Sequence, residues 1–153
     1  MTTAHFVKKC RKTIRGTGIK KGDSYWWWKF RYGDKHVSKT QPRPSQLTGS
    51  EFLGTVYSIE EGLADVDVSD REEVASVIET AKEELAQLRD ETDEKFNNMP
   101  DSLQQGDTGQ LLEQRVQDVD TMIDELDNID PTEEDLSNDD LRNELDAISY
   151  SGD

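Results

Sequence analysis

The sequence predicts an α+β fold: a small β-hairpin head packed on a helix, followed by an antiparallel α-helical hairpin and an acidic terminal segment. Three observations predict this fold. An aromatic run near the N-terminus has strand periodicity, two apolar seams of similar length follow it with helical periodicity, and the charge changes sign between the two regions. Residues 1–45 hold 12 Lys and Arg against two acids, and residues 46–153 hold 6 against 32.

The strand signal lies in residues 24–39. Aromatic residues favour strands, Gly33 and Asp34 supply a turn, and residues 35–39 return, so we expect a β-hairpin. Side chains alternate along a strand, so four aromatic residues share one face, which we expect to be buried. These are Trp26, Trp28, Phe30 and Tyr32. The glycine-containing residues 1–23 are expected to form a basic, flexible surface loop, with a phosphate-cradling loop as the alternative.

The opposite face of the hairpin mixes aromatic and cationic side chains, namely Tyr25, Trp27, Lys29 and Arg31. Such a face can stack bases and neutralise phosphates. A structural role fits equally well. Trp27 then covers a second layer, with Lys29 and Arg31 lying over it or a cation–π pair forming within the hairpin. The residues alone leave both interpretations open.

The segment after the hairpin predicts a linker and then a helix. Pro42 and Pro44 keep residues 40–45 extended. Residues 48–51 (Thr-Gly-Ser-Glu) match a capping box, and the apolar spacing that follows predicts a helix that ends near Gly62. A lone hairpin cannot bury its aromatic face, so this helix is the expected cover. The head with its first helix is therefore assigned to residues 1–66.

Two heptad seams predict the helical hairpin of residues 67–130. A second capping box at residues 69–72 opens a helix that runs to about Asn97, and a third helix is expected over about residues 110–128. The first seam is Val74, Ile78, Ala81, Leu85, Leu88 and Thr92, and the second is Leu112, Val116, Val119, Ile123 and Leu126. Narrow seams of this kind favour an antiparallel two-stranded coiled coil, with association into a homodimer as a further option.

Residues 131–153 form the acidic tail. Leu141, Leu145 and Ile148 lie at i, i+4 and i+7, which is the spacing of one helix face. Two interpretations stay open for this segment. It is either a short amphipathic helix that folds on a partner, or a disordered tail that keeps the chain in solution.

Several function classes are disfavoured by the composition. Only 32% of the residues are hydrophobic and 34% are charged, so we expect a small core without an enclosed catalytic pocket, and no enzyme. The single cysteine, Cys10, is expected to be a free thiol in a mobile segment, and no residues lie at metal-ligand spacing, so neither metal nor cofactor is expected. No apolar run reaches the roughly 18 residues of a membrane span, so the expected location is the cytoplasm, of the host if the source is viral.

The first functional hypothesis is nucleic-acid binding by the head. The Trp-Lys-Phe-Arg strand, the glycine turn and the lysines that follow are similar to the β-sheet arms at the N-termini of tyrosine recombinases. This resemblance covers residues 24–60, no catalytic domain follows it, and it implies DNA docking alone. The residues expected to contact nucleic acid are Lys20, Lys21, Tyr25, Trp27, Lys29, Arg31, Lys35, Lys39 and Arg43.

The second hypothesis gives the acidic helices the leading role. A helical surface covered in carboxylates can imitate the phosphates of DNA and occupy the basic groove of a host or phage protein, as an inhibitor of host defence or an adaptor. The expected contacts are Asp118, Asp120, Asp124, Asp127, Leu141, Leu145 and Ile148. Residues 20–32 and 98–113 resemble coil-containing proteins of tailed phages, which implies a phage source and adds a minor virion component as a third hypothesis.

Overall fold

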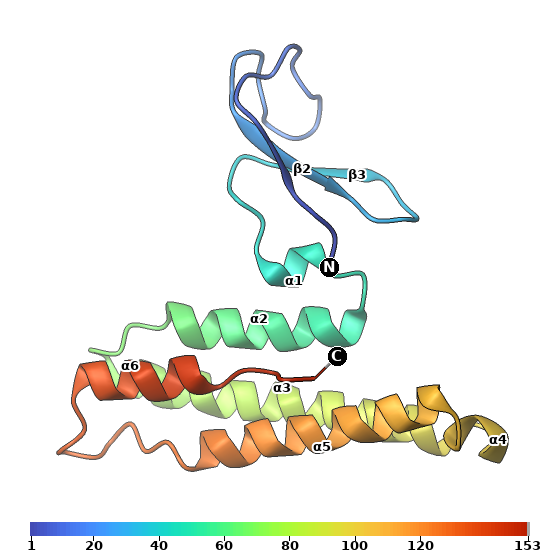
Figure 1. Cartoon of the computed structure of the whole chain (residues 1–153). Helices are drawn as coiled ribbons and strands as arrows, with labels where there is room; N and C mark the ends of the chain where they lie inside the picture. Colours follow the sequence, from blue (N-terminus) through green and yellow to red (C-terminus); the bar gives the residue numbers. More distant parts are fainter. Residues whose placement is uncertain (153) are drawn as a thin grey trace. The chain divides into compact units, whose positions relative to one another are not determined.

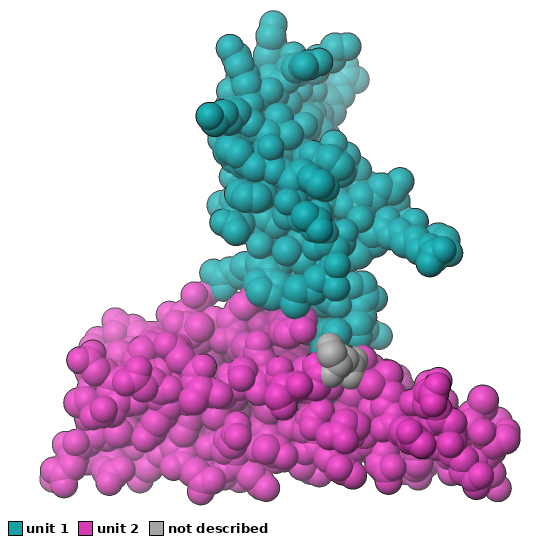
Figure 2. Space-filling view, in the orientation of Figure 1, with its two compact units in different colours: residues 1–55 teal, residues 56–153 magenta. Residues whose placement is uncertain are grey.

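The computed structural model describes residues 1–152 and contains two compact units, Met1–Thr55 (unit 1) and Val56–Asp153 (unit 2), which Figure 2 shows in two colours. The sequence predicted boundaries after residues 66 and 130, so the structure differs in joining the acidic tail to the helical hairpin. Unit 1 contains β1 (His5–Val7), β2 (Tyr25–Lys29), β3 (Lys35–Ser38) and α1 (Pro44–Leu47). The helix α2 (Glu51–Asp65) crosses the boundary, and unit 2 continues with α3 (Arg71–Asn97), α4 (Asp101–Gln104), α5 (Asp107–Asp127) and α6 (Asn138–Ala147).

The predicted α+β class is confirmed, with a third strand that the sequence did not indicate. The strands form an antiparallel sheet in the order β1-β2-β3. β1 pairs with β2 so that His5 lies opposite Trp27, and β3 pairs with β2 so that Val37 lies opposite the same Trp27. Because β1 has only three residues and lies in a basic segment, it has no alternation long enough to predict a strand.

The connection between β2 and β3 is longer than the predicted turn. The last paired residues are Lys29 and Lys35, so residues 30–34 form the loop, and Gly33 adopts a φ of 127° that other residues rarely accept. The strand therefore ends before the aromatic alternation does. Trp28 is buried as predicted, but Tyr32 lies in the loop and is 83% exposed, so the prediction of a wholly buried aromatic face was wrong.

Residues 8–23 form turns and bends that are mostly exposed, as expected of a surface loop, but two of their side chains pack inward. Cys10 and Ile19 are buried. The backbone N–H of Cys10 donates to the carbonyl of Asp23 (2.7 Å), and the N–H of Gly22 donates to the carbonyl of Cys10 (2.9 Å). Ile14 and Ile19 form a β-bridge around a turn in which two glycines have positive φ. Cys10 is thus a free but buried thiol, and its S–H donates to the carbonyl of Lys12.

The predicted linker of residues 40–45 is shorter than expected, because the short helix α1 begins at Pro44, while Arg43 before it is extended as predicted (φ −83°, ψ 161°). The N-terminal strand segment is bound to α1, because the N–H of Thr2 donates to the carbonyl of Leu47 (2.7 Å). The hydroxyl of Thr2 also donates to the carbonyl of Lys29 (2.9 Å). The next helix, α2, begins at Glu51, two residues later than a capping box with Thr48 as its N-cap predicts. The N-cap is instead Ser50, whose hydroxyl accepts the N–H of Leu53.

The helical hairpin of unit 2 consists of α3 and α5, joined by α4, and the two long helices lie side by side in opposite directions (Figure 1). All six residues of the predicted α3 seam are buried. In the α5 seam Val119 and Leu126 are buried, with Met122 beside them, whereas Leu112, Val116 and Ile123 are half-buried. The heptad spacing therefore predicted the pairing, and the α5 stripe is rotated toward Met122.

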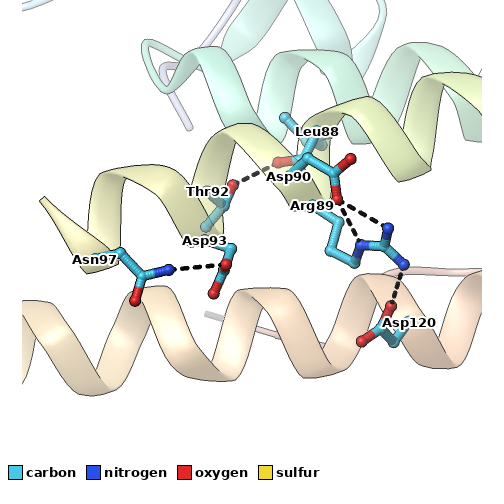
Figure 3. A network of polar contacts seen from close by, with 7 residues as sticks. All are labelled: Leu88, Arg89, Asp90, Thr92, Asp93, Asn97 and Asp120. Atoms are coloured by element: carbon cyan, nitrogen blue, oxygen red, sulfur yellow. Dashed lines mark hydrogen bonds and ion pairs between the residues drawn. The ribbon is translucent and has the colours of Figure 1, made fainter.

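Polar contacts fix the register of this hairpin. The guanidinium of Arg89 on α3 forms an ion pair with Asp120 on α5 (3.2 Å) and another with its neighbour Asp90 (Figure 3). Lys82 spans the same helices to Asp127 (2.8 Å). Thr92 is buried in the seam because its hydroxyl donates to the carbonyl of Leu88 one turn earlier, so no polar group is left unsatisfied there.

The acidic tail is part of unit 2. Leu141, Leu145 and Ile148 are buried in the core of unit 2. The helix face that was expected to bind a partner or to stay disordered therefore packs within the unit itself. The guanidinium of Arg142 on α6 donates to the carbonyls of Leu63 (3.0 Å), Ala64 (2.8 Å) and Val66, at the end of α2. α2 has no cation in its own last turn, so Arg142 supplies the positive charge that a helix C-terminus favours.

A second arginine holds the segment that precedes α6. The guanidinium of Arg71, at the start of α3, donates to the carbonyl of Leu136 (2.7 Å), to that of Pro131 (3.4 Å) and to the side chain of Asn138 (2.9 Å). After α6, the N–H of Tyr150 donates to the carboxylate of Glu60 on α2 (2.6 Å). The tail is therefore fixed at three points along its length.

Replacing Arg142 by methionine should destabilise the chain by about 2–3 kcal/mol, because a charged hydrogen bond contributes about 1.5–3 kcal/mol and the three carbonyls share a single guanidinium as their donor. Urea unfolding followed by circular dichroism measures this change. Arg15→Met is the matched control. It removes one charge from an exposed position and should change the free energy of unfolding by about 0.5 kcal/mol or less. Equal effects of the two changes would contradict the tether.

Glu60→Gln should stabilise the chain at neutral pH. Burial raises the pKa of the Glu60 carboxyl, and this outweighs the N–H of Tyr150, which lowers it. A carboxyl with a raised pKa in the folded chain favours folding below its unfolded pKa and loses that contribution as the pH rises. The melting temperature of E60Q should therefore exceed that of the parent at pH 7 and match it near pH 4. Glu83→Gln, at an exposed position of α3, should show no such pH dependence.

Candidate nucleic-acid interface

The two faces of the unit 1 sheet differ in composition. Residues that lie opposite one another in an antiparallel sheet share a face. The register therefore places on one face His5, Val7, Tyr25, Trp27, Lys29, Lys35 and Val37, which we call the Trp27 face. The other face carries Phe6, Trp26, Trp28, His36 and Ser38. The Trp27 face thus combines aromatic rings with cations, as the alternation predicted, and β1 adds His5 and Val7.

Trp27 lies at the centre of this face and already has two partners. The ring of His5 stacks on it at 4.5 Å between centroids with 25° between the planes, and the ammonium of Lys35 lies 4.1 Å from its ring centroid. Trp27 therefore makes a cation–π contact within the hairpin, as the structural interpretation predicts, and the cation is Lys35 in place of Lys29 or Arg31. Arg31 lies in the loop, where its guanidinium is 5.6 Å from the ring of Tyr32. Trp27 acts as the packing centre that positions Lys35.

A hollow of about 420 Å³ adjoins the Tyr25 end of the same face. We call it the Tyr25 hollow, and its lining residues are Val7, Lys9, Cys10, Arg11, Lys12, Ile14 and Tyr25. The side chains of Lys9, Arg11 and Lys12 are exposed, and among the described residues none of the three has an ion-pair partner. The lining therefore combines buried or half-buried apolar and aromatic side chains with three exposed cations. A base fits the first surface, and phosphates fit the second.

A second hollow lies at the loop end of the hairpin. It measures about 570 Å³ and is lined by Phe30, Arg31, Tyr32 and Gly49. Phe30 is half-buried, and its ring contacts His36 edge-on at 5.5 Å. Phe30 and Tyr32 were predicted to lie on the buried face, so the alternation did not identify them as rings at the surface. Gly33 correctly indicated a turn, but no signal in the sequence places the end of β2 at Lys29, which leaves the last two aromatic residues of the run in the loop.

The remaining predicted cations are separate from these hollows. Lys39 forms an ion pair with Asp23 (3.5 Å). A hydrogen bond from the N–H of Lys20 lowers the pKa of the Asp23 carboxyl, and Lys39 adds to this effect. The N–H of Lys21 donates to Thr13, and that of Arg43 donates to Gln46 at the start of α1. Lys29 and Lys35 lie on the Trp27 face, so the structure groups them with Tyr25 and Trp27.

The four predicted aspartates of α5 do not form one uniform exposed array. Asp120 and Asp127 form ion pairs with Arg89 and Lys82, as described above, and Asp118 is half-buried and accepts the side-chain amide of Gln114 (2.7 Å). Asp124 is exposed. Two of the four carboxylates therefore serve the contact between α3 and α5, which leaves Asp124 as the one fully available to a partner.

Comparisons with protein-family models, curated proteins and solved structures found no match to this chain. Within residues 1–152, no group of three or more His, Cys, Asp and Glu side chains is arranged to hold a metal ion. Nor does that part of the chain contain a helix long and apolar enough to cross a membrane. The candidate interface therefore rests on the side chains of unit 1 themselves.

The burial of Cys10 gives a direct check on the folded state of residues 8–23, which form one wall of the Tyr25 hollow. A thiol that is 3% exposed should react with a disulfide reagent on the order of 100-fold more slowly in the native chain than in urea, because reaction requires local opening. The release of the reagent's chromophore measures both rates. A native thiol that reacts as fast as the unfolded one would show that this segment is flexible after all.

Proposed function

We propose that this chain is a binding protein whose unit 1 contacts nucleic acid through the Tyr25 hollow and the adjoining Trp27 face. The observation that carries the proposal is the Tyr25 hollow, whose lining combines an aromatic ring and apolar side chains with three exposed cations that have no ion-pair partner within residues 1–152. Lys29 and Lys35 extend the positive charge along the same face of the sheet.

The charge of unit 1 supports this proposal. Its 12 Lys and Arg face three acids, Asp23, Asp34 and Glu51, a net charge of +9. Phosphate contacts supply most of the sequence-independent affinity for nucleic acid, because each one releases condensed counterions. Such binding falls steeply with salt, whereas binding to a neutral ligand does not.

A single strand is the favoured form of the ligand. Bases inside a duplex are stacked on one another, and only an unpaired base can enter a hollow and lie against a tyrosine ring. A strand that places one base on Tyr25 can continue past the ammonium groups of Lys35 and Lys29 with its phosphates. Trp27 then contributes indirectly, by holding Lys35 in place.

The test is fluorescence anisotropy of labelled oligothymidine with the full chain at several salt concentrations. Tyr25→Leu keeps an apolar residue in the hollow but removes the ring, and should weaken binding by about 1–3 kcal/mol, the usual contribution of base stacking. Lys9→Ala/Lys12→Ala should weaken binding at least about tenfold and reduce the salt slope by about 1.4, because each single-strand phosphate contact contributes about 0.7.

Lys20→Ala/Lys21→Ala is the matched control, since it removes the same charge from the same unit outside the hollow. It should weaken binding by about threefold or less through long-range attraction alone. Equal losses in the two double variants would mean that binding follows total charge and that the hollow has no special role. Tighter binding to a duplex of the same length would exclude the stacked base.

Unit 2 favours a second candidate function, an acidic inhibitor or adaptor that engages a basic protein. Its 31 acids against 6 basic residues give a net charge of −25. Among the described residues, Arg71 and Arg142 bond to carbonyls of other elements, and Lys82 and Arg89 bond to carboxylates. Most of the acidic charge is therefore left without compensation, which attracts basic partners and repels nucleic acid.

A further inference from the structure

Unit 2 has a hollow of about 340 Å³ where α5 and α6 end, lined by Glu125, Asn128, Ile129, Glu144, Ala147 and Ile148. We call it the α5–α6 hollow. Ile129, Ala147 and Ile148 provide its apolar surface, and Glu125 and Glu144 are exposed beside them. The hollow therefore combines an apolar floor with two carboxylates, one from each helix.

Nothing in the described part of the chain neutralises these two carboxylates. Neither the Glu125 nor the Glu144 side chain has an ion pair or a hydrogen bond within residues 1–152, and no basic residue lines the hollow. The nearby ion pairs engage other acids, since Lys82 bonds to Asp127 and Arg142 to Asp146 (3.7 Å). A cationic group entering the hollow thus finds both acceptors available.

The backbone adds to the negative potential at the same place. α5 ends at Asp127 and α6 at Ala147, and neither helix has a basic residue in its last turn. The carbonyl end of a helix carries a partial negative charge that favours cations. The potential at the hollow is therefore negative, because the two helix ends, the two carboxylates and the unit's net charge of −25 all contribute negative charge. A negative potential disfavours nucleic acid or a second acidic unit as the occupant.

We propose that the α5–α6 hollow is the docking site for a basic, amphipathic segment of a partner protein. The aliphatic stem of an arginine or lysine packs on Ile129 and Ala147, and its charged end bonds to Glu125 or Glu144. An exposed ion pair by itself contributes about 1 kcal/mol or less, so the affinity requires apolar contact as well, which a protein segment supplies and a small cation does not. This site deepens the second candidate function and does not depend on nucleic-acid binding by unit 1.

The experiment uses the full chain and a fluorescein-labelled helical peptide built from leucine and arginine, with a matched peptide that has glutamine in place of arginine. We expect saturable binding of the arginine peptide in fluorescence anisotropy and no measurable binding of the glutamine peptide. In NMR spectra of the full chain, the arginine peptide should shift the amide signals of Ile129, Ala147 and Ile148. Glu125→Gln/Glu144→Gln should weaken binding about tenfold, because it removes both acceptors. The fold should persist in this variant, because neither carboxylate has a partner within residues 1–152.

Glu133→Gln/Glu134→Gln is the matched control, since it removes the same charge from exposed positions outside the hollow. It should weaken binding by at most about threefold through general electrostatics. Ala147→Arg is a second probe, because it places a cation of the chain itself in the hollow. This variant should abolish binding of the arginine peptide. All of these variants should bind oligothymidine like the parent, which separates this proposal from the function proposed for unit 1.

Three results would overturn the proposal. Equal losses in the two double variants would assign the binding to diffuse charge, and failure of the arginine peptide to bind would exclude the site. Self-association of the parent at low salt that disappears in Glu125→Gln/Glu144→Gln, measured by sedimentation velocity, would identify the occupant as a second copy of this chain.

Discussion

A few long cationic side chains hold the acidic unit together. Thirty-one acids in one small unit repel each other, and each cation that spans two elements offsets part of that repulsion where the helices meet. Arg142 and Arg71 bond chiefly to backbone carbonyls, so they fix the tail without neutralising most of the acids around them. The same arrangement that stabilises the fold therefore keeps its surface strongly negative.

The basic unit follows a different principle. Its sheet is too small to bury both faces, and aromatic pairs across the strands compensate: His5 with Trp27, Phe6 with Trp26 and Trp28 with His36. These pairs hold the rings rigidly and leave the cations at the edges in solvent. A ligand that needs both a flat apolar contact and positive charge meets both in the Tyr25 hollow. The two units carry net charges of opposite sign, +9 for unit 1 and −25 for unit 2.

The parts of the fold that could be predicted are those set by periodicity. Every residue of the α3 seam is buried, because a heptad repeat determines which side chains meet a neighbouring helix. The parts that could not be predicted depend on contacts between distant residues. β1 is specified by its pairing with β2, and the order of residues 8–23 depends on hydrogen bonds between Cys10 and residues 22–23. The apolar spacing of Leu141, Leu145 and Ile148 indicated a helix at α6, but it did not indicate that the helix packs in the core, where Arg142 bonds to the end of α2.

The candidate site was predicted in part for the same reason. Alternation along β2 correctly grouped Tyr25, Trp27 and Lys29, whereas the hollow beside Tyr25 also needs Lys9, Arg11 and Lys12 from a segment whose folding has no local signal. Nor could alternation reveal that the strand stops at Lys29, which moves Arg31 and Tyr32 into the loop.

If nucleic acid binds unit 1 at the Tyr25 hollow while unit 2 stays free, an NMR titration of the full, isotope-labelled chain with oligothymidine will reveal it. We expect progressive amide shifts confined to residues 7–14, 25–29 and 35–37, with the signals of α3, α5 and α6 unchanged. Shifts confined to unit 2, or none at a stoichiometric excess of the oligonucleotide, would contradict binding at this hollow.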